Sequence, residues 1–219
     1  VIFKRKHNWI MCFIYLGTFG SFLGFSAGFP LLIQTAFPAV NPVKYAFLGP
    51  LIGALTRPFG GWIADKTGSG AKITQWVFIG MIAAVFGVLS FLPSETQSGS
   101  FWGFFACFMI LFALSGIGNG STFMQIPVIF LEQHQKYAEQ GLVSPEQARL
   151  NATREGAAVA GFSGAFAAFG GFFIPQSYNF SLKATGSVTA AFIGFILFYA
   201  VCLLLNWWYY SRNGAEAKC

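Results

Sequence analysis

Long apolar stretches are the feature that most constrains how this chain folds. Six of them approach or exceed the roughly 20 residues that a helix needs to cross a bilayer: 9–33, 45–64, 73–92, 101–131, 156–175 and 188–210. Of the 219 residues, 55% are hydrophobic and 9% are charged, whereas soluble domains usually carry about 25% charged residues. The sequence therefore predicts an all-α polytopic membrane protein with six transmembrane helices.

The basic side chains predict how these spans are oriented. Lysines and arginines fall unequally on the two sides of the predicted spans, with Lys4, Arg5, Lys6, Lys66, Lys72, Lys136, Arg149, Arg154, Arg212 and Lys218 on one side and Lys44 and Lys183 on the other. The side richer in basic residues is cytoplasmic by the positive-inside rule. We therefore expect a multi-pass protein of the inner or plasma membrane, with both ends of this segment and a loop over 132–155 in the cytoplasm. Within that loop, Ser144, Pro145 and Gln147 predict a helix start that leads into the fifth span.

Several classes of function find no support in the sequence. The net charge of +6 does not indicate a nucleic-acid partner, because the basic residues flank apolar runs instead of clustering on one solvated face. The four cysteines show no paired spacing. Neither histidine and none of the acidic residues lies within a predicted span. We therefore expect no metal, no cofactor and no enzyme, since a membrane redox subunit or enzyme would need ligands or a catalytic carboxylate there.

Arg57 is the one charged residue within a predicted span, roughly 12 Å along a helix from Asp65. An arginine near the middle of a bilayer costs about 2.5–3.5 kcal/mol on insertion scales, and such residues usually face a cavity or a pathway. The structural alternative is a side chain that reaches the membrane surface. Without a carboxylate partner in the spans, the guanidinium indicates an anionic substrate, and its planar fork suits nitrate, nitrite and carboxylates equally well.

Two motifs add a resemblance to a known family. The segment from Gly61 to Gly68 resembles the G-x-x-x-D-[RK]-x-G loop of the major facilitator superfamily, in which the acidic and basic residues tether neighbouring helices. The segment from Gly161 to Pro175 resembles the second glycine-rich signature of the nitrate/nitrite porters, the NarK-type carriers of that superfamily. Segments 15–22, 24–29, 45–57 and 118–123 also resemble the carboxyl-terminal half of that family.

The resemblance implies a set of substrate-binding residues. Arg57 corresponds to the substrate-binding arginine of this half, with Tyr15 and Phe19 as neighbouring pocket residues, and Gly161 to a signature glycine that lets the backbone approach the substrate.

The glycine-rich segment departs from the family pattern at one place. The family often has serine three residues after the signature glycine, where this chain has Gly164, preceded by Ser163, and both are candidate substrate-binding residues. Small residues that recur every four positions, namely Gly156, Ala160, Gly164 and Ala168, alternatively predict close helix packing. Packing is also the role expected for the glycines on either side of Asn119.

The resemblance also implies an architecture and a mechanism. Residues 1–219 would form the carboxyl-terminal six-helix half of a carrier whose missing amino-terminal half brings a second arginine. Two facing arginines repel in an empty site, which favours nitrate-in, nitrite-out exchange by alternating access, in the service of nitrate assimilation. Proton-coupled nitrate symport, with its relay in the other half, and a carrier for another small anion such as a carboxylate remain as alternatives, and a channel formed by a homodimer has less support.

Overall fold

A computed structural model describes residues 2–93, 98–217 and 219 of the chain, and no strand is present among them. Lys218, one of the basic residues used to predict the orientation, lies outside the described residues. The α-helices in chain order are α1 (Lys6–Tyr15), α2 (Ser21–Ala36), α3 (Leu48–Thr67), α4 (Gly70–Phe91), α5 (Phe101–Glu139), α6 (Pro145–Ala168), α7 (Gly170–Thr185) and α8 (Thr189–Asn206). A π-helical turn, Leu16–Gly20, joins α1 to α2, and a second, Trp207–Ser211, continues α8.

Among the described residues, five helical segments are long and apolar enough to cross a membrane: Lys6–Ala36, Gly70–Phe91, Phe101–Glu139, Pro145–Thr185 and Thr189–Ser211. The predicted second span corresponds to α3, which has 20 residues but is not one of the five. Arg57, two prolines and four glycines lower its hydropathy. The described residues are therefore helical without strands, with five candidate spans and, in α3, a further helix of 20 residues.

The segment expected to be a loop, 132–155, is mostly helical. Helix α5 continues to Glu139 and α6 begins at Pro145, so the connection is confined to residues 140–144. Gly141 adopts a left-handed conformation with φ of 72° after the end of α5. The helix start predicted at Ser144 is confirmed, because its hydroxyl accepts a hydrogen bond of 3.2 Å from the backbone N–H of Gln147.

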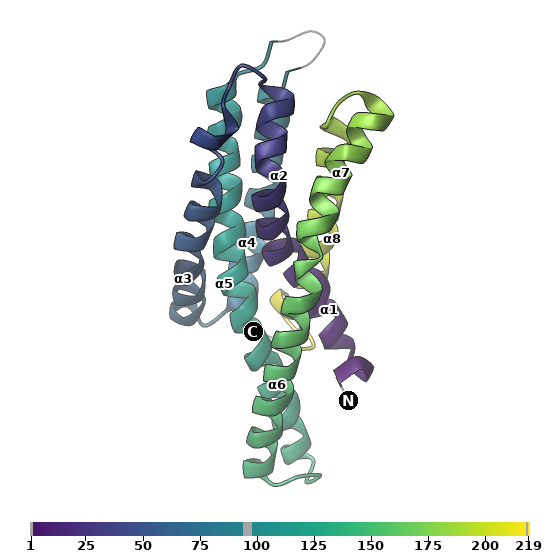
Figure 1. Ribbon diagram of the computed structural model, residues 1–219. Helices are drawn as coiled ribbons and strands as arrows, with labels where there is room; N and C mark the ends of the chain where they lie inside the picture. Colours follow the sequence, from purple (N-terminus) through teal and green to yellow (C-terminus); the bar gives the residue numbers. More distant parts are fainter. Residues whose placement is uncertain (1, 94–97, 218) are drawn as a thin grey trace.

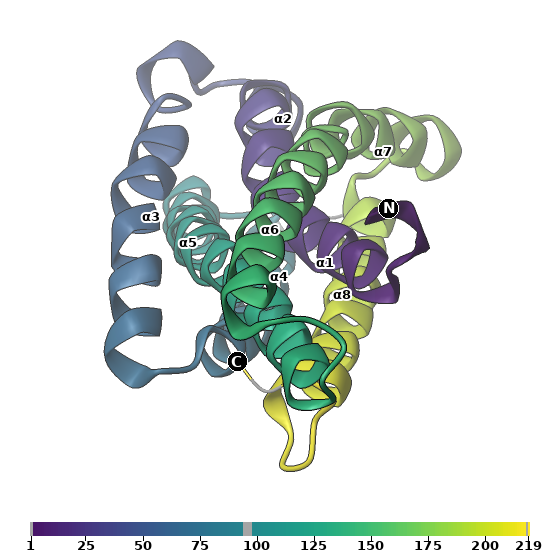
Figure 2. The same cartoon turned by 90° about the horizontal axis from the view of Figure 1, so that it is seen from below.

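Helix α5 lies at the centre of the bundle and packs against α3, α4 and α6, while α2 packs against α7 and α4 against α8. The α5–α6 hairpin projects beyond the other helices, and both marked chain ends lie toward that end of the molecule (Figure 1). Viewed along the bundle, α6 runs obliquely between the α3–α5 pair and the α1–α8 pair (Figure 2).

Glycines bring α5 into backbone contact with α3. A Cβ atom added to Gly116 would lie 2.2 Å from the carbonyl oxygen of Gly53, and one added to Gly120 would lie 2.2 Å from the carbonyl oxygen of Arg57. No real side chain fits at these distances, so the packing role expected for these α5 glycines is confirmed. This close approach fixes the backbone of Arg57 relative to α5.

Two helix interruptions meet next to the predicted site. The first span is interrupted by the π-helical turn Leu16–Gly20, and the fifth span at Phe169, between α6 and α7. A Cβ atom added to Gly170 would lie 2.2 Å from the carbonyl oxygen of Gly20, so the two backbones touch where the helices change direction. Single π-helical turns within α-helices occur frequently at functional sites, and this one contains Phe19.

The partly buried carboxylate of Glu155 in α6 binds Arg5, in the segment before α1, and His134 of α5. Arg5 binds Glu155 through two nitrogens, with Nε 2.8 Å from Oε1 and Nη2 3.2 Å from Oε2, and donates a third hydrogen bond of 2.8 Å to the Tyr137 hydroxyl. His134 Nε2 lies 2.7 Å from the same carboxylate. A bidentate arginine–carboxylate pair is among the stronger polar contacts in proteins.

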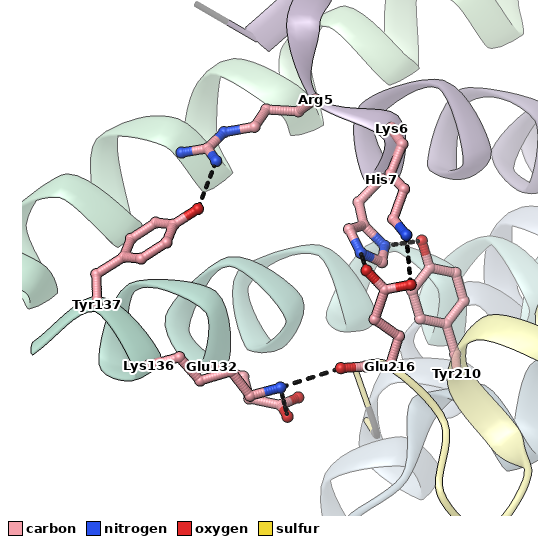
Figure 3. A network of polar contacts seen from close by, with 8 residues as sticks. All are labelled: Arg5, Lys6, His7, Glu132, Lys136, Tyr137, Tyr210 and Glu216. Carbon is pink, nitrogen blue, oxygen red and sulfur yellow. Dashed lines mark hydrogen bonds and ion pairs between the residues drawn. The ribbon is translucent and has the colours of Figure 1, made fainter. Parts of the chain in front are cut away.

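Glu216, near the end of the chain, joins three elements at the same end of the molecule (Figure 3). Its carboxylate accepts a hydrogen bond from Lys6 Nζ and lies 3.3 Å from His7 Nε2, whose Nδ1 is 2.9 Å from the Tyr210 hydroxyl. The backbone carbonyl of Glu216 accepts a hydrogen bond of 3.1 Å from Lys136 Nζ. These contacts hold the segment after α8 against α1 and α5.

This contact predicts a small pH dependence of stability. Burial raises the pKa of the Glu216 carboxyl, but hydrogen bonds from Lys6 and His7 together bring the pKa below its ordinary value of 4.5. Because the folded-state pKa is depressed, the stabilisation is present above about pH 4.5 and is lost as pH falls through the lower, folded-state value. Thermal unfolding between pH 7 and pH 3 measures it: Glu216→Gln is expected to flatten part of the acid decline, and an identical decline in both proteins would contradict the assignment.

Candidate functional site

Arg57 extends from the middle of α3 onto an exposed surface of the bundle. Its guanidinium carbon lies 5.7 Å from the centre of the Phe19 ring. Within the described part of the chain, its side chain makes no ion pair and donates no hydrogen bond. A cation over an aromatic face is attracted by the ring quadrupole, which leaves the N–H donors of the guanidinium free for another partner.

Tyr15 and Phe19 form an aromatic stack beneath this arginine. Their ring centres are 5.2 Å apart with an interplanar angle of 28°. Tyr15 directly precedes the π-helical turn and Phe19 lies within it. Because the two residues are four apart in sequence, their side chains lie on the same face of the helix. The structure therefore brings together Arg57, Phe19 and Tyr15, three of the residues predicted from the sequence.

Phe123 of α5 extends this aromatic group and was not among the residues predicted from the sequence. Its ring centre lies 6.4 Å from that of Tyr15, and 41% of its surface is exposed. The only signal for it in the sequence was its place at the end of segment 118–123, which resembles the family.

An open groove of about 350 Å³ runs from Phe123 between α5 and α6. Its lining consists mainly of small and apolar residues: Phe123, Pro127, Leu131, Ala152, Thr153, Gly156, Ala157 and Ala160. Farther along α6, a Cβ atom added to Gly161 or Gly164 would meet no atom within 4 Å. Gly161 and Gly164 thus lie on open surface within this chain, and close helix packing does not explain them here, whereas Gly170 of the same segment packs against the backbone of Gly20.

Ser163 points in a different direction from these glycines. Its side chain is fully buried, and its hydroxyl oxygen lies 3.4 Å from Cys12 Sγ on α1. No contact in the described residues joins Ser163, Gly161 or Gly164 to Arg57. The structure therefore places Ser163 in the interface between α6 and α1.

The facilitator-type loop at the end of α3 does not tether a neighbouring helix in this structure. Among the described residues, neither Asp65 nor Lys66 forms an ion pair, and Lys66 Nζ lies 5.0 Å above the Trp62 ring of its own helix. Gly68 ends α3 in a left-handed conformation with φ of 65°, which explains the last glycine of the motif.

The arrangement is suited to holding an anion. Across residues 2–93, 98–217 and 219, no group of three or more histidine, cysteine or acidic side chains lies close enough to bind a metal ion. The fold and the site define a helical membrane protein that presents one unpaired guanidinium, backed by aromatic rings, on an open face.

Comparison with known proteins gives the family. The chain is 48% identical over 218 residues to the nitrate/nitrite transporter NarU of Escherichia coli, covering 99% of this chain and 46% of that protein. It is 40% identical over 222 residues to the probable nitrate/nitrite antiporter NarK2 of Thermus thermophilus, covering 100% and 45%. It is also 28% identical over 220 residues to a nitrite extrusion protein of Bacillus subtilis, covering 97% and 47%. No family model matches the chain. The chain belongs to the nitrate/nitrite transporter family that includes NarU and NarK.

The chain spans about half the length of the curated relatives it matches. Each of these relatives is therefore longer by an amount close to the length of this chain. The described helices, and the exposed face around Arg57, therefore correspond to about half of the length of such a protein.

Proposed function

We propose that this chain forms the carboxyl-terminal six-helix half of a major facilitator carrier, and that the complete protein exchanges nitrate for nitrite across the inner or plasma membrane. The observation that carries the proposal is the unpaired Arg57 guanidinium, held over the Phe19 ring on an open face. The names of the relatives, transporter and antiporter of nitrate and nitrite, support this substrate and this mode.

In the proposed topology α3 is the second of six spans, although its hydropathy is lower than that of the others. A helix that lines a pathway or packs against a second half does not need an apolar surface all round. The arrangement of the basic residues supports placing both ends of the segment and the tip of the α5–α6 hairpin in the cytoplasm.

The proposed mechanism follows from charge. Arg57 and an arginine from the amino-terminal half would hold the anion between them, while the ring edges of Phe19 and Phe123 offer positive quadrupole to it. With the site empty, the two guanidinium groups repel each other, so the carrier crosses between its two states more readily when loaded. If the carrier must hold an anion each time it crosses between its two states, each anion carried inward is matched by one carried outward, which is exchange.

Selectivity among anions tests the proposed substrate. The complete protein that contains this chain is reconstituted into liposomes loaded with isotopically labelled nitrite, and efflux is followed after adding nitrate, nitrite, formate, acetate or chloride outside. Nitrate and nitrite are expected to drive efflux, and the others are not. Formate or acetate driving efflux as fast as nitrate would show a carboxylate carrier instead.

Replacement of Gly161 by alanine tests whether the open face of α6 belongs to the pathway. A Cβ atom at this position meets nothing within 4 Å in this chain, so yield and thermal stability are expected to match those of the unaltered protein. The exchange rate is expected to fall several-fold, because the added methyl group narrows the space left to the substrate or the other half.

Gly194→Ala is the matched control, because Gly194 of α8 is equally open. It is expected to change neither stability nor exchange. An unaltered exchange rate in Gly161→Ala would place this face outside the pathway.

A further inference from the structure

Asn119 is a buried amide at the centre of α5, directly beneath the aromatic stack. Only 1% of its surface is exposed, and its Oδ1 accepts a hydrogen bond of 2.8 Å from the Tyr15 hydroxyl. The Tyr15 side chain is 2% exposed. This bond between α5 and α1 links residues 104 positions apart in the sequence.

The backbone on both sides of Asn119 is held by close contacts. A Cβ atom added to Gly118 would lie 2.8 Å from a methyl carbon of Thr18 in the π-helical turn. A Cβ atom added to Gly120 would lie 2.2 Å from the carbonyl oxygen of Arg57 in α3. Helix α5 is thus pressed between two elements at this level, and the amide of Asn119 is fixed with respect to both.

A chain of contacts leads from this fixed amide to the exposed arginine. The hydrogen bond that Asn119 Oδ1 accepts from the Tyr15 hydroxyl restrains the phenol. The phenol ring stacks on Phe19 with 5.2 Å between centres, and the Arg57 guanidinium carbon lies 5.7 Å from the centre of the Phe19 ring. No hydrogen bond joins Asn119 or Tyr15 to Arg57 within the described residues. The buried amide therefore acts on the arginine through the positions of two rings.

We propose that Asn119 is a positioning residue, whose hydrogen bond to Tyr15 sets, through the Tyr15–Phe19 stack, where the Arg57 guanidinium lies on the open face. This proposal adds a positioning residue to the proposed function, and it rests on that function in assuming that Arg57 binds the transported anion. The claim that Asn119 determines the position of the Arg57 guanidinium does not depend on which anion the protein carries.

The first test measures apparent KM and maximal rate for nitrate in nitrite-loaded liposomes containing the complete protein. Asn119→Leu and Tyr15→Phe each remove one partner of the hydrogen bond, and each is expected to raise KM about ten-fold, the order expected for losing one buried hydrogen bond. The maximal rate per folded carrier is expected to change little. Because both substitutions break one interaction, the double variant is expected to show the KM of either single variant.

Ser115→Ala is the matched control. Ser115 is fully buried in the same helix, but its hydroxyl donates to the backbone carbonyl of Phe112 in α5 itself. Its replacement is expected to leave KM unchanged. An unchanged KM in folded Asn119→Leu, or effects of Asn119→Leu and Tyr15→Phe that add in the double variant, would overturn the proposal.

A second readout requires no transport. The rate at which phenylglyoxal modifies Arg57 is measured by mass spectrometry on the purified complete protein without added anion. Loss of the Asn119–Tyr15 bond is expected to raise this rate several-fold, and Ser115→Ala is expected to leave it unchanged.

The two readouts separate the two claims. If Asn119→Leu does not fold, Tyr15→Phe, which keeps the ring, decides the outcome. If the unaltered protein exchanges no nitrate, the proposed function fails, while the modification rate still tests the role of Asn119. An unaltered modification rate in the folded variants would overturn that role.

Discussion

Replacing Arg57 with lysine is expected to reduce nitrate/nitrite exchange about 100-fold or more while leaving membrane insertion and yield near those of the unaltered protein. Lysine keeps the positive charge but loses the planar fork and the broad contact with the Phe19 ring, which the guanidinium carbon approaches to 5.7 Å. The measurement is the initial exchange rate in liposomes, normalised to the amount of inserted carrier.

Arg212→Lys provides a matched control for this substitution. The Arg212 guanidinium also lies over an aromatic ring, 4.1 Å from the centre of Trp208, but at the end of the last helical segment and away from the candidate site. Exchange is expected to be retained in Arg212→Lys. Exchange at the unaltered rate in Arg57→Lys would contradict the role assigned to the guanidinium.

Replacing Gly120 with alanine is expected to lower the stability of the protein more than the other substitutions proposed above. The added Cβ would lie 2.2 Å from the carbonyl oxygen of Arg57 and 2.7 Å from the amide nitrogen of Gly61, both backbone atoms of α3. No flexible side chain can move aside, so α3 and α5 must separate, at an expected cost of about 1–3 kcal/mol. Exchange is expected to fall as well, because the displaced backbone is that of Arg57.

Thermal unfolding of the purified complete protein measures the first effect and exchange in liposomes the second. Gly194→Ala is again the control, since its added methyl group meets no atom within 4 Å. A Gly120→Ala variant with unaltered stability and exchange would contradict this prediction, because it would show that the α3–α5 interface accommodates a methyl group at this position.

Local patterns in the sequence predicted the apolar helical segments. Apolar stretches predict the helical segments because a helix in lipid must be apolar over most of its length, and Ser144 predicts the start of α6 because its side chain satisfies a backbone N–H of the first turn. Arg57 was identifiable because a lone cation within an apolar run is costly unless it serves a purpose.

The segment 132–155 shows the limit of that reasoning. It was expected to be a cytoplasmic loop with a helix starting at Ser144, but it is rich in glutamine, glutamate and alanine over its whole length, and these residues favour helices. Polarity reports contact with water or headgroups and does not by itself end a helix. The helices therefore continue past the apolar stretches on both sides of Gly141.

The contacts within the candidate site could not be predicted from the spacing of residues in the sequence. The bond between Tyr15 and Asn119 and the contact between Tyr15 and Phe123 join residues far apart in sequence. The direction of Ser163 follows from the packing of α6 against α1, where it meets Cys12. Neighbouring positions of a helix point about 100° apart, so Ser163 faces an interface while Gly164 beside it lies on the open face.

The most direct measurement is nitrate uptake by the complete protein in liposomes, with and without internal nitrite and with and without a proton gradient. Uptake that requires internal nitrite and is insensitive to the gradient is the expected result, because an anion held between two arginines must be replaced for the carrier to return. Uptake driven by the gradient without internal nitrite would contradict exchange and indicate symport, and no nitrate flux under any condition would contradict the proposed substrate.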